Sequence, residues 1–184
     1  MQSKIDDVLR FWIDDVGEAG WYASSEELDA RIRSQFLGLW EQAMAGDLDC
    51  WITTPQGALA LLVLLDQFPR NMFRGDGAAF RSDPLALSFA KRAIALGHDG
   101  KTPEPQRQFF YLPLMHSENL PDQERCVRMI MLGMPECGAD NLPHAVKHRE
   151  VIRKFGRFPS RNAALGRSDT DAERAYRAEG GYMS

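Results

Sequence analysis

The residues best suited to chemistry in this sequence lie in two similar motifs and one short polar stretch. The first motif, DQFPRN, spans residues 66–71, and the second, GRFPSRN, spans residues 156–162. The polar stretch, HSE at residues 116–118, supplies a histidine and a carboxylate. Arginine can hold an anion through paired hydrogen bonds, and a histidine oriented by a carboxylate can act as a general base. The same residue types can also form a purely structural ion network.

Asp66 is the residue that most needs a partner. It follows the apolar run ALALLVLL at residues 58–65, which predicts a helix buried on every side. A carboxylate at the C-terminal end of such a helix faces the negative end of the helix dipole, and burial without a partner would cost more still. We therefore expect Asp66 to contact Arg70 or the arginines of the second motif. Pro69 and Pro159 should each break the helix before them.

The two motifs leave two explanations open. They could be structural corners whose arginines hold helix ends and carboxylates, or they could pack together and form one site. The histidines are equally open. His116 could be a general base, a ligand or a hydrogen-bonded interior residue. His144 and His148 are four residues apart and could share a helix face, but Ala145 stands where a zinc-peptidase helix has glutamate. We expect neither a metal nor a cofactor.

Charge and composition narrow the class of protein. The chain has 184 residues with a net charge of -4, which gives no support to nucleic-acid binding. Residues 147–167 carry +6, so the remainder carries -10, and this basic segment favours an anionic partner. No apolar run approaches the roughly 20 residues needed to cross a bilayer. The three cysteines form no CxxC pair, so we expect reduced thiols and a cytoplasmic protein.

The elements that must position these residues are predicted to be helices, because no stretch alternates apolar and polar residues as a strand would. Helices are expected at about 4–16, 24–46, 54–65, 83–97, 102–115, 121–133, 142–155 and 168–181. Their predicted N-terminal signals are Ser24 with Glu27, Thr54 with Pro55, Asp83 with Pro84, and Thr102 with Pro103. The sequence thus predicts one all-α domain over residues 1–184, with about eight antiparallel helices arranged as a bundle or a solenoid. The tetratricopeptide signature itself cannot be laid over the chain.

Several blocks of this sequence resemble a known family. In order, they are VLRFWIDD, LLDQFPRNMFRG, AFRSDPLAL, RQFFYLPLMHSENL and HREVIRKFGRFPSRNAALGR. Together they resemble the signature of the bacterial family of unknown function DUF924. The resemblance implies a tetratricopeptide-like α/α superhelix and supplies no activity. The polar signature positions that it implies are Asp66, Gln67, Arg70, Asn71, His116, Glu118, His148, Arg157, Arg161 and Asn162.

Three functions are consistent with these residues. The first is a binding module that holds a small anionic ligand or an acidic peptide in a concave polar site. The second is an enzyme of hydrolase type, with His116 or His148 as general base, Asp66 or Glu118 orienting it, and Arg157 or Arg161 holding an oxyanion. The third is a buried ion network that only locks the helices together. The sequence leaves the oligomeric state open.

Overall fold

Helices form all the regular secondary structure in the computed structural model, which describes residues 2–182, and that range contains no strand. The α-helices are α1 (Gln2–Leu9), α2 (Gly17–Gly20), α3 (Glu26–Met44), α4 (Pro55–Leu62), α5 (Phe68–Met72), α6 (Asp83–Ala95), α7 (Leu112–Met115), α8 (Leu120–Gly133), α9 (Gly138–Phe155) and α10 (Asp171–Ala178). Two π-helical turns are η1 (Arg10–Val16) and η3 (Val63–Gln67). Short 3-10 turns are η2 (Asp49–Thr53), η4 (Gly77–Phe80), η5 (Asp99–Lys101), η6 (Gln106–Phe110) and η7 (Pro159–Arg161). The all-α prediction is confirmed, whereas the tetratricopeptide-like superhelix stays a prediction.

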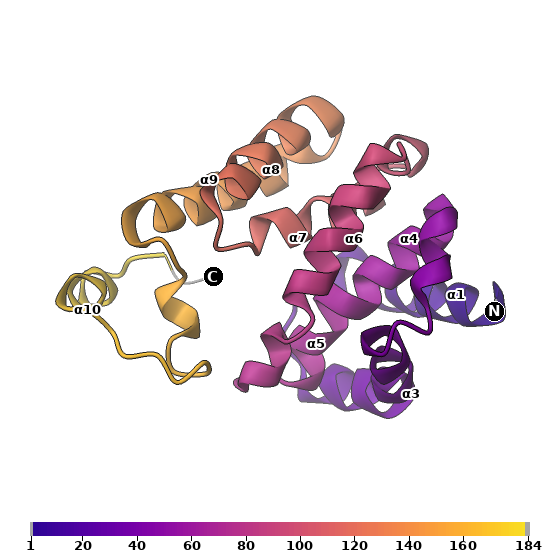
Figure 1. Ribbon diagram of the computed structural model, residues 1–184, viewed down its shortest axis with the longest axis horizontal. Coiled ribbons are helices and arrows are strands. Elements are labelled where there is room, and N and C mark those ends of the chain that lie inside the picture. Colours follow the sequence, from indigo (N-terminus) through magenta and orange to yellow (C-terminus); the bar gives the residue numbers. More distant parts are fainter. Residues whose placement is uncertain (1, 183–184) are drawn as a thin grey trace.

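The helix at the centre of the molecule is formed by α4, η3 and α5 in succession. Every residue from 57 to 69 is buried, as the apolar run predicts. α1 and α6 pack against α4, and α3 packs against α5, so that the central helix has neighbours around it (Figure 1). This burial places Asp66 inside the molecule rather than at a solvent-exposed helix end.

Pro69 does not break this helix, so the prediction of a helix end there is wrong. Phe68 keeps helical dihedral angles, and the N–H of Phe68 donates to the carbonyl of Val63, which makes the turn a π-turn. Because proline has no N–H, the carbonyl of Leu65 lacks its α-helical donor. The hydroxyl of Ser82 donates to that carbonyl over 2.6 Å, and the helix continues to Met72.

The predicted helix starts have mixed outcomes. Thr54 accepts a hydrogen bond from Gly57 N with Pro55 at the first helical position, so this cap is confirmed. The cap of α3 is Ser25 rather than Ser24, and it accepts from Leu28 N. Asp83 lies inside α6 as its first residue and makes ion pairs instead of a cap. Thr102 starts no α-helix, because the chain there forms η6 and then the four-residue α7.

The C-terminal part of the chain, residues 151–182, has a small apolar cluster of its own. α8 and α9 lie side by side as a helical hairpin, and α10 lies beyond them on the left of Figure 1. Val151, Ile152 and Phe158 form the centre of this cluster, with Tyr176 and Tyr182 packed against it. The large cluster of the remaining molecule does not include these residues. Apolar residues of α8 and of the first half of α9 belong to the large cluster, so the separate cluster covers only residues from 151 onward.

A close contact joins η4 to the loop that contains Ala164. A Cβ on Gly77 would lie 2.6 Å from the carbonyl oxygen of Ala164, closer than any real side chain permits. Only glycine lets the 164–165 backbone approach η4 at this distance. Glycine at position 77 therefore allows the segment at residues 164–165 to pack closely against η4.

Candidate functional site

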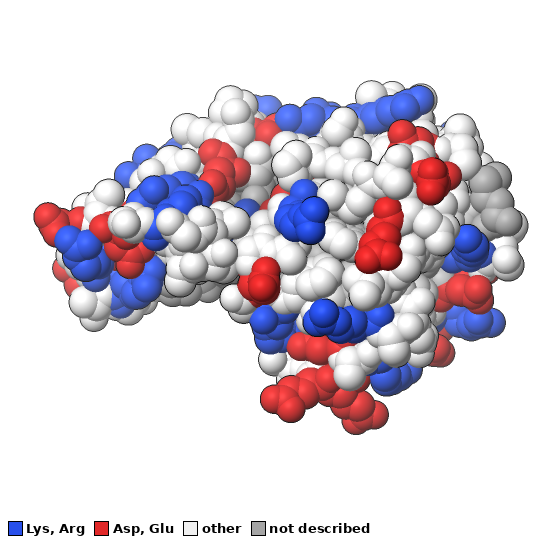
Figure 2. All heavy atoms as spheres, turned by 60° about the horizontal axis from the view of Figure 1, so that its bottom comes forward, with Lys and Arg blue, Asp and Glu red and all other residues white. Residues whose placement is uncertain are grey.

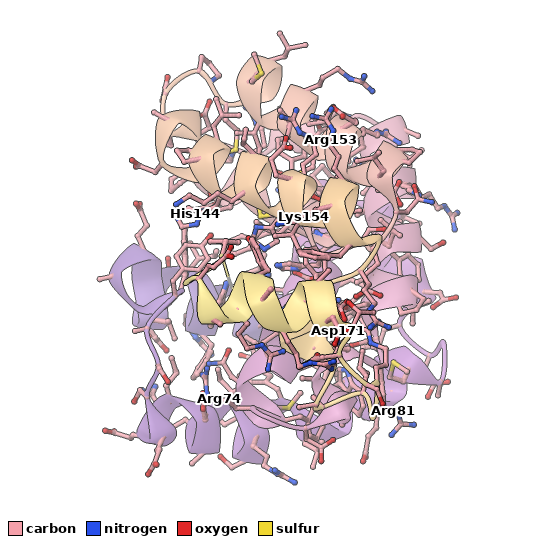
Figure 3. All side chains as sticks on the ribbon, turned by 90° about the vertical axis from the view of Figure 1, so that its left-hand side faces the viewer. Arg74, Arg81, His144, Arg153, Lys154 and Asp171 are labelled. Atoms are coloured by element: carbon pink, nitrogen blue, oxygen red, sulfur yellow. The ribbon has the colours of Figure 1, made fainter. Side chains whose placement is uncertain are left out.

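The structure contains a pocket of about 630 Å³ between the central helix and α9, with Tyr182 at its edge. Its walls come from the turn after α2, from η3 and α5, from α7, from α9 and from Tyr182 near the C-terminus. In Figure 3, His144 of α9 lies above the end of α10 and Arg74 lies below it, and both residues line the pocket. The lining residues include Glu18, Trp21, Tyr22, Ala23, Gln67, Arg70, Asn71, Arg74, Gln108, His116, Cys137, Asp140, Asn141, His144, His148 and Tyr182.

Asp66 and His116 form a hydrogen-bonded pair at the inner wall of the pocket. His116 Nδ1 lies 2.8 Å from Asp66 Oδ1, and Gln67 Nε2 donates to the other carboxylate oxygen. Asp66 is 1% exposed, whereas 16% of the His116 side chain is exposed. Burial alone would raise the pKa of Asp66, but His116, Arg70 and these hydrogen bonds outweigh burial and lower that pKa. Burial and the nearby Arg70 lower the pKa of His116.

A neutral His116 beside an ionised Asp66 has a defined tautomer. The carboxylate can only accept, so Nδ1 carries the proton and Nε2 carries the lone pair. Nε2 has no hydrogen-bond partner in residues 2–182 and is not among the sealed buried atoms. This arrangement is the one that a general base needs.

His148, in α9, also donates a hydrogen bond from Nδ1, as His116 does. Its ring centroid lies 6.3 Å from that of His116, and its Nδ1 donates to the backbone carbonyl of His144 over 2.8 Å. The edge-on rings of Phe158 and Tyr182 pack against it. Burial and the nearby His116 lower the pKa of His148 to about 3, so the imidazole is neutral at physiological pH. His144 and His148 thus contact each other through backbone rather than through a shared metal position.

The arginines of the two motifs do converge, and they meet on Asp83. Arg70 pairs with Asp83 over 3.1 Å and with Asp66 over 3.4 Å. Arg161 pairs with the other oxygen of Asp83 over 3.2 Å, and both guanidinium groups lie over the ring of Phe80. Burial and the proximity of Arg70 lower the pKa of Arg161 to about 10, which leaves it charged at neutral pH. This chain of ion pairs ties the second motif to the central helix.

Comparison with known proteins assigns the chain to a family. The family described as "Bacterial protein of unknown function (DUF924)" matches residues 8–181. The chain belongs to the DUF924 family. A solved structure of a protein of unknown function from Agrobacterium tumefaciens is 37% identical in sequence to this member of DUF924, with a TM-score of 0.90. That likeness covers 97% of this chain and 99% of the other. No curated protein matches the sequence.

Some DUF924 signature residues lie outside the pocket. Glu118 accepts two hydrogen bonds from Arg167 and one from the backbone N–H of Phe158, and these bonds lower its pKa despite its burial. Arg157 makes two hydrogen bonds to Glu173, at 2.6 and 2.7 Å, and holds the pKa of that carboxyl at about 2. These contacts fasten α10 and the loop before it.

Asn162 and Arg161 have the same kind of role. Asn162 donates to Asp169 over 2.7 Å, and neither residue borders the pocket. The structure therefore brings Asp66, Gln67, Arg70, Asn71, His116 and His148 to one place. It puts Glu118, Arg157, Arg161 and Asn162 elsewhere.

The basic segment of this DUF924 chain does not present free positive charge to the pocket. Each of its five arginines has a carboxylate partner: Arg149 and Arg153 pair with Glu124 and Glu150, Arg157 with Glu173, Arg161 with Asp83, and Arg167 with Glu118. Lys147 and Lys154 lie over aromatic rings. Figure 2 shows blue and red residues intermixed over the C-terminal part rather than one basic patch. Most of the positive charge of this segment is therefore paired internally, and the anionic partner stays a prediction.

Sequence reasoning missed several residues of the pocket. Tyr22 donates to Gln108, and both line the pocket together with Tyr182. None of these three residues lies in a recognisable sequence motif. Each is brought to the pocket by contacts with residues far away in the sequence. Cys137 also lines the pocket, but burial and nearby carboxylates raise its pKa, so its thiol is a poor nucleophile. In residues 2–182, no cluster of three or more His, Cys, Asp or Glu is placed to hold a metal ion, and no helix there could span a membrane.

Proposed function

We propose that this protein binds a small molecule in the 630 Å³ pocket. The observation that carries the proposal is the Asp66–His116 pair, which points an accessible imidazole nitrogen at a cavity of ligand size. Keeping a carboxylate fully buried costs desolvation energy, and perturbed groups of this kind cluster at functional sites. Pockets of about 300–1,000 Å³ with a few convergent polar groups are the usual form of small-molecule sites.

The four histidines provide a direct test of pocket binding. His116, His144 and His148 line the pocket, whereas His98 is buried elsewhere with its ring bonded to the carbonyl of Ile52. We expect some members of a fragment library to shift the ring carbon signals of His116 and His148 in NMR spectra of ¹³C-histidine-labelled protein. The signal of His98 should stay fixed. If no fragment shifts a pocket histidine selectively, the proposal is refuted.

A pocket-blocking variant makes that test sharper. Ala23 is exposed and lines the pocket, so Ala23→Trp should fill part of the cavity without disturbing the core. Ala45→Trp is the matched control, because Ala45 is exposed at the end of α3, away from the pocket. Fragment shifts should weaken in Ala23→Trp and persist in Ala45→Trp.

Catalysis by His116 is the second candidate function, and the open Nε2 favours it. Asp66 would orient the imidazole and stabilise the imidazolium, and Nε2 would take a proton from the substrate or from a water molecule that attacks it. We expect the wild-type protein to consume at least one compound of a defined metabolite pool, followed by mass spectrometry. His116→Gln and Ala23→Trp should both lose that activity. Identical pool compositions with and without protein would leave binding alone as the function.

A further inference from the structure

Four side chains of the pocket, of which three are buried and His116 is half-buried, each donate a hydrogen bond to another group of the protein. Gln67 and His116 donate to Asp66, Asn71 donates to Asp29 over 2.8 Å, and His148 donates to the carbonyl of His144. The carboxylates of Asp66 and Asp29 both have lowered pKa values and so act only as acceptors, as a carbonyl always does. This fixes the orientation of both amides and the tautomer of both rings.

Besides the second N–H of each amide, the unpaired polar atoms of these side chains are acceptors. They are Gln67 Oε1, Asn71 Oδ1, His116 Nε2 and His148 Nε2, and none has a hydrogen-bond partner in the described part of the chain. Gln67 and His148 are only 7% and 6% exposed, yet these acceptor atoms are not sealed from the surface. A ligand that displaces solvent from these acceptors must donate hydrogen bonds to them, because an acceptor that is buried without a partner is costly.

The charges around the pocket point the same way through independent contacts. Arg70 is neutralised by Asp66 and Asp83, and Arg74 makes two hydrogen bonds to Asp29 at 2.7 and 2.9 Å. Glu18 and Asp140 line the pocket, are exposed, and have no ion-pair partner within residues 2–182. The uncompensated charge of the lining is therefore negative.

From the acceptor set and this residual charge, we infer that the ligand of the pocket is a small organic cation, a protonated amine or a guanidine. Its N–H groups would donate to the imidazole nitrogens and amide oxygens, and its charge would face Glu18 and Asp140. The aromatic faces of Tyr22, Trp21 and Tyr182, which also line the pocket, suit a cation. The inference rests on the proposed small-molecule pocket and narrows its ligand to one class.

The lining also has donors that an anion could contact. The amide nitrogens of Gln108 and Asn141, one terminal nitrogen of Arg74 and Nε of Arg70 are donors without a partner in the described range. A carboxylate or phosphate bound there would also have to sit among neutral imidazole lone pairs and two free carboxylates. The inferred class thus differs from the anionic ligand or acidic peptide that the basic segment favours.

Three probes of equal carbon length test the inference: pentane-1,5-diamine, pentane-1,5-diol and glutarate. At pH 7.5, the diamine should shift the ring carbon signals of His116 and His148 in ¹³C-histidine-labelled protein and leave His98 unchanged. The diol should bind much more weakly and glutarate should have no effect. A diol as effective as the diamine, or a response to glutarate alone, would overturn the cation assignment.

Two double variants separate pocket charge from the general acidity of the protein. Glu18→Gln with Asp140→Asn removes the two free carboxylates and breaks no internal contact. It should raise the apparent Kd for the diamine by about fivefold or more. Glu41→Gln with Asp47→Asn removes the same charge from exposed positions outside the pocket and should leave the Kd unchanged. Equal effects of the two double variants would overturn the inference.

The fragment test described above distinguishes the two levels of failure. If fragments shift the pocket histidines but the diamine does not, the pocket is a binding site of another ligand class. If neither fragments nor the diamine shift them, small-molecule binding fails and the inference fails with it.

Discussion

Replacing His148 with glutamine should make the stability of the protein less sensitive to acid. Burial and the neighbouring His116 lower the pKa of His148 to about 3 in the folded state, compared with an ordinary value of 6.5. Below pH 6.5, the unfolded chain therefore binds a proton at this position that the folded protein does not. Stability is lost as pH falls from 6.5 toward 3, at about 1.36 kcal/mol per pH unit. Between pH 8 and pH 5, this one residue should account for a loss of about 2 kcal/mol.

Urea unfolding followed by tryptophan fluorescence at pH 8 and pH 5 measures this loss. The decrease in unfolding free energy should be smaller in His148→Gln than in the wild type by about 2 kcal/mol. Some acid sensitivity should remain, because the pKa of His116 is also lowered. His144→Gln is the control, because His144 is exposed on the same helix and its replacement should leave the wild-type decrease intact. The reasoning is refuted if His148→Gln and wild type lose equal stability, or if NMR titration places the pKa of His148 near 6.5.

Three further predictions concern the contacts that hold the site in place, each measured by urea unfolding at pH 7.5. Asp83→Ala leaves Arg70 and Arg161 without their shared carboxylate and should lower the unfolding free energy by about 3 kcal/mol. The control Asp171→Ala, at a position whose side chain is 96% exposed, should lower it by less than about 0.5 kcal/mol. Similar losses for both variants would contradict a structural role for Asp83. Ser82→Ala removes the donor to the Leu65 carbonyl and the acceptor of the Trp40 indole N–H, so we expect a loss of about 2 kcal/mol, with exposed Ser34→Ala as the near-neutral control. An unchanged midpoint for Ser82→Ala would show that the π-turn does not depend on this hydroxyl. Gly77→Ala should destabilise the protein by about 1–3 kcal/mol, because the new Cβ would meet the Ala164 carbonyl. The control Gly38→Ala lies inside α3, where a Cβ has no atom within 4 Å, and should stabilise the protein by about 0.5–1 kcal/mol. Stability changes of the same sign in both variants would disprove the steric explanation.

The sequence was a good guide where one local signal determined the structure. Thr54 and Pro55 start a helix because their side-chain oxygen and fixed φ act within one turn. The run at residues 58–65 had to be buried, since nothing in it is polar, and the helix start at Thr54 and Pro55 made a helix the better prediction than a strand. The demand of Asp66 for partners also followed from burial alone, and the structure supplies His116, Gln67 and Arg70.

Local rules failed where a distant residue supplied the missing group. Pro69 looks like a helix end, but Ser82 compensates the lost hydrogen bond from another helix. Asp83 resembles an N-cap residue in the sequence, yet its carboxylate forms ion pairs with two arginines that are far apart in the sequence. Neither contact leaves a pattern in a single sequence, because the spacing between the partners follows no helical period.

The similarity of the two Phe-Pro motifs hid a difference in their surroundings. The first continues a central helix and contributes Gln67, Arg70 and Asn71 to the pocket. The second forms an extended residue and a short 3-10 turn, and its Arg157 holds α10 through Glu173. Which of two equal motifs borders a cavity depends on the packing of whole helices, and a motif carries no information about that.

The separate apolar cluster of the C-terminal part has a consequence for how the molecule opens. A unit with few buried apolar contacts unfolds locally at a lower free energy than the whole. Amide hydrogens of α10 should therefore exchange with deuterium earlier than those of α4, in steps that do not require global unfolding. Each such opening would carry Tyr182 away from the pocket. A ligand that contacts Tyr182 would slow this exchange. The protection of α10 amides from hydrogen exchange would then measure how much of the pocket is occupied.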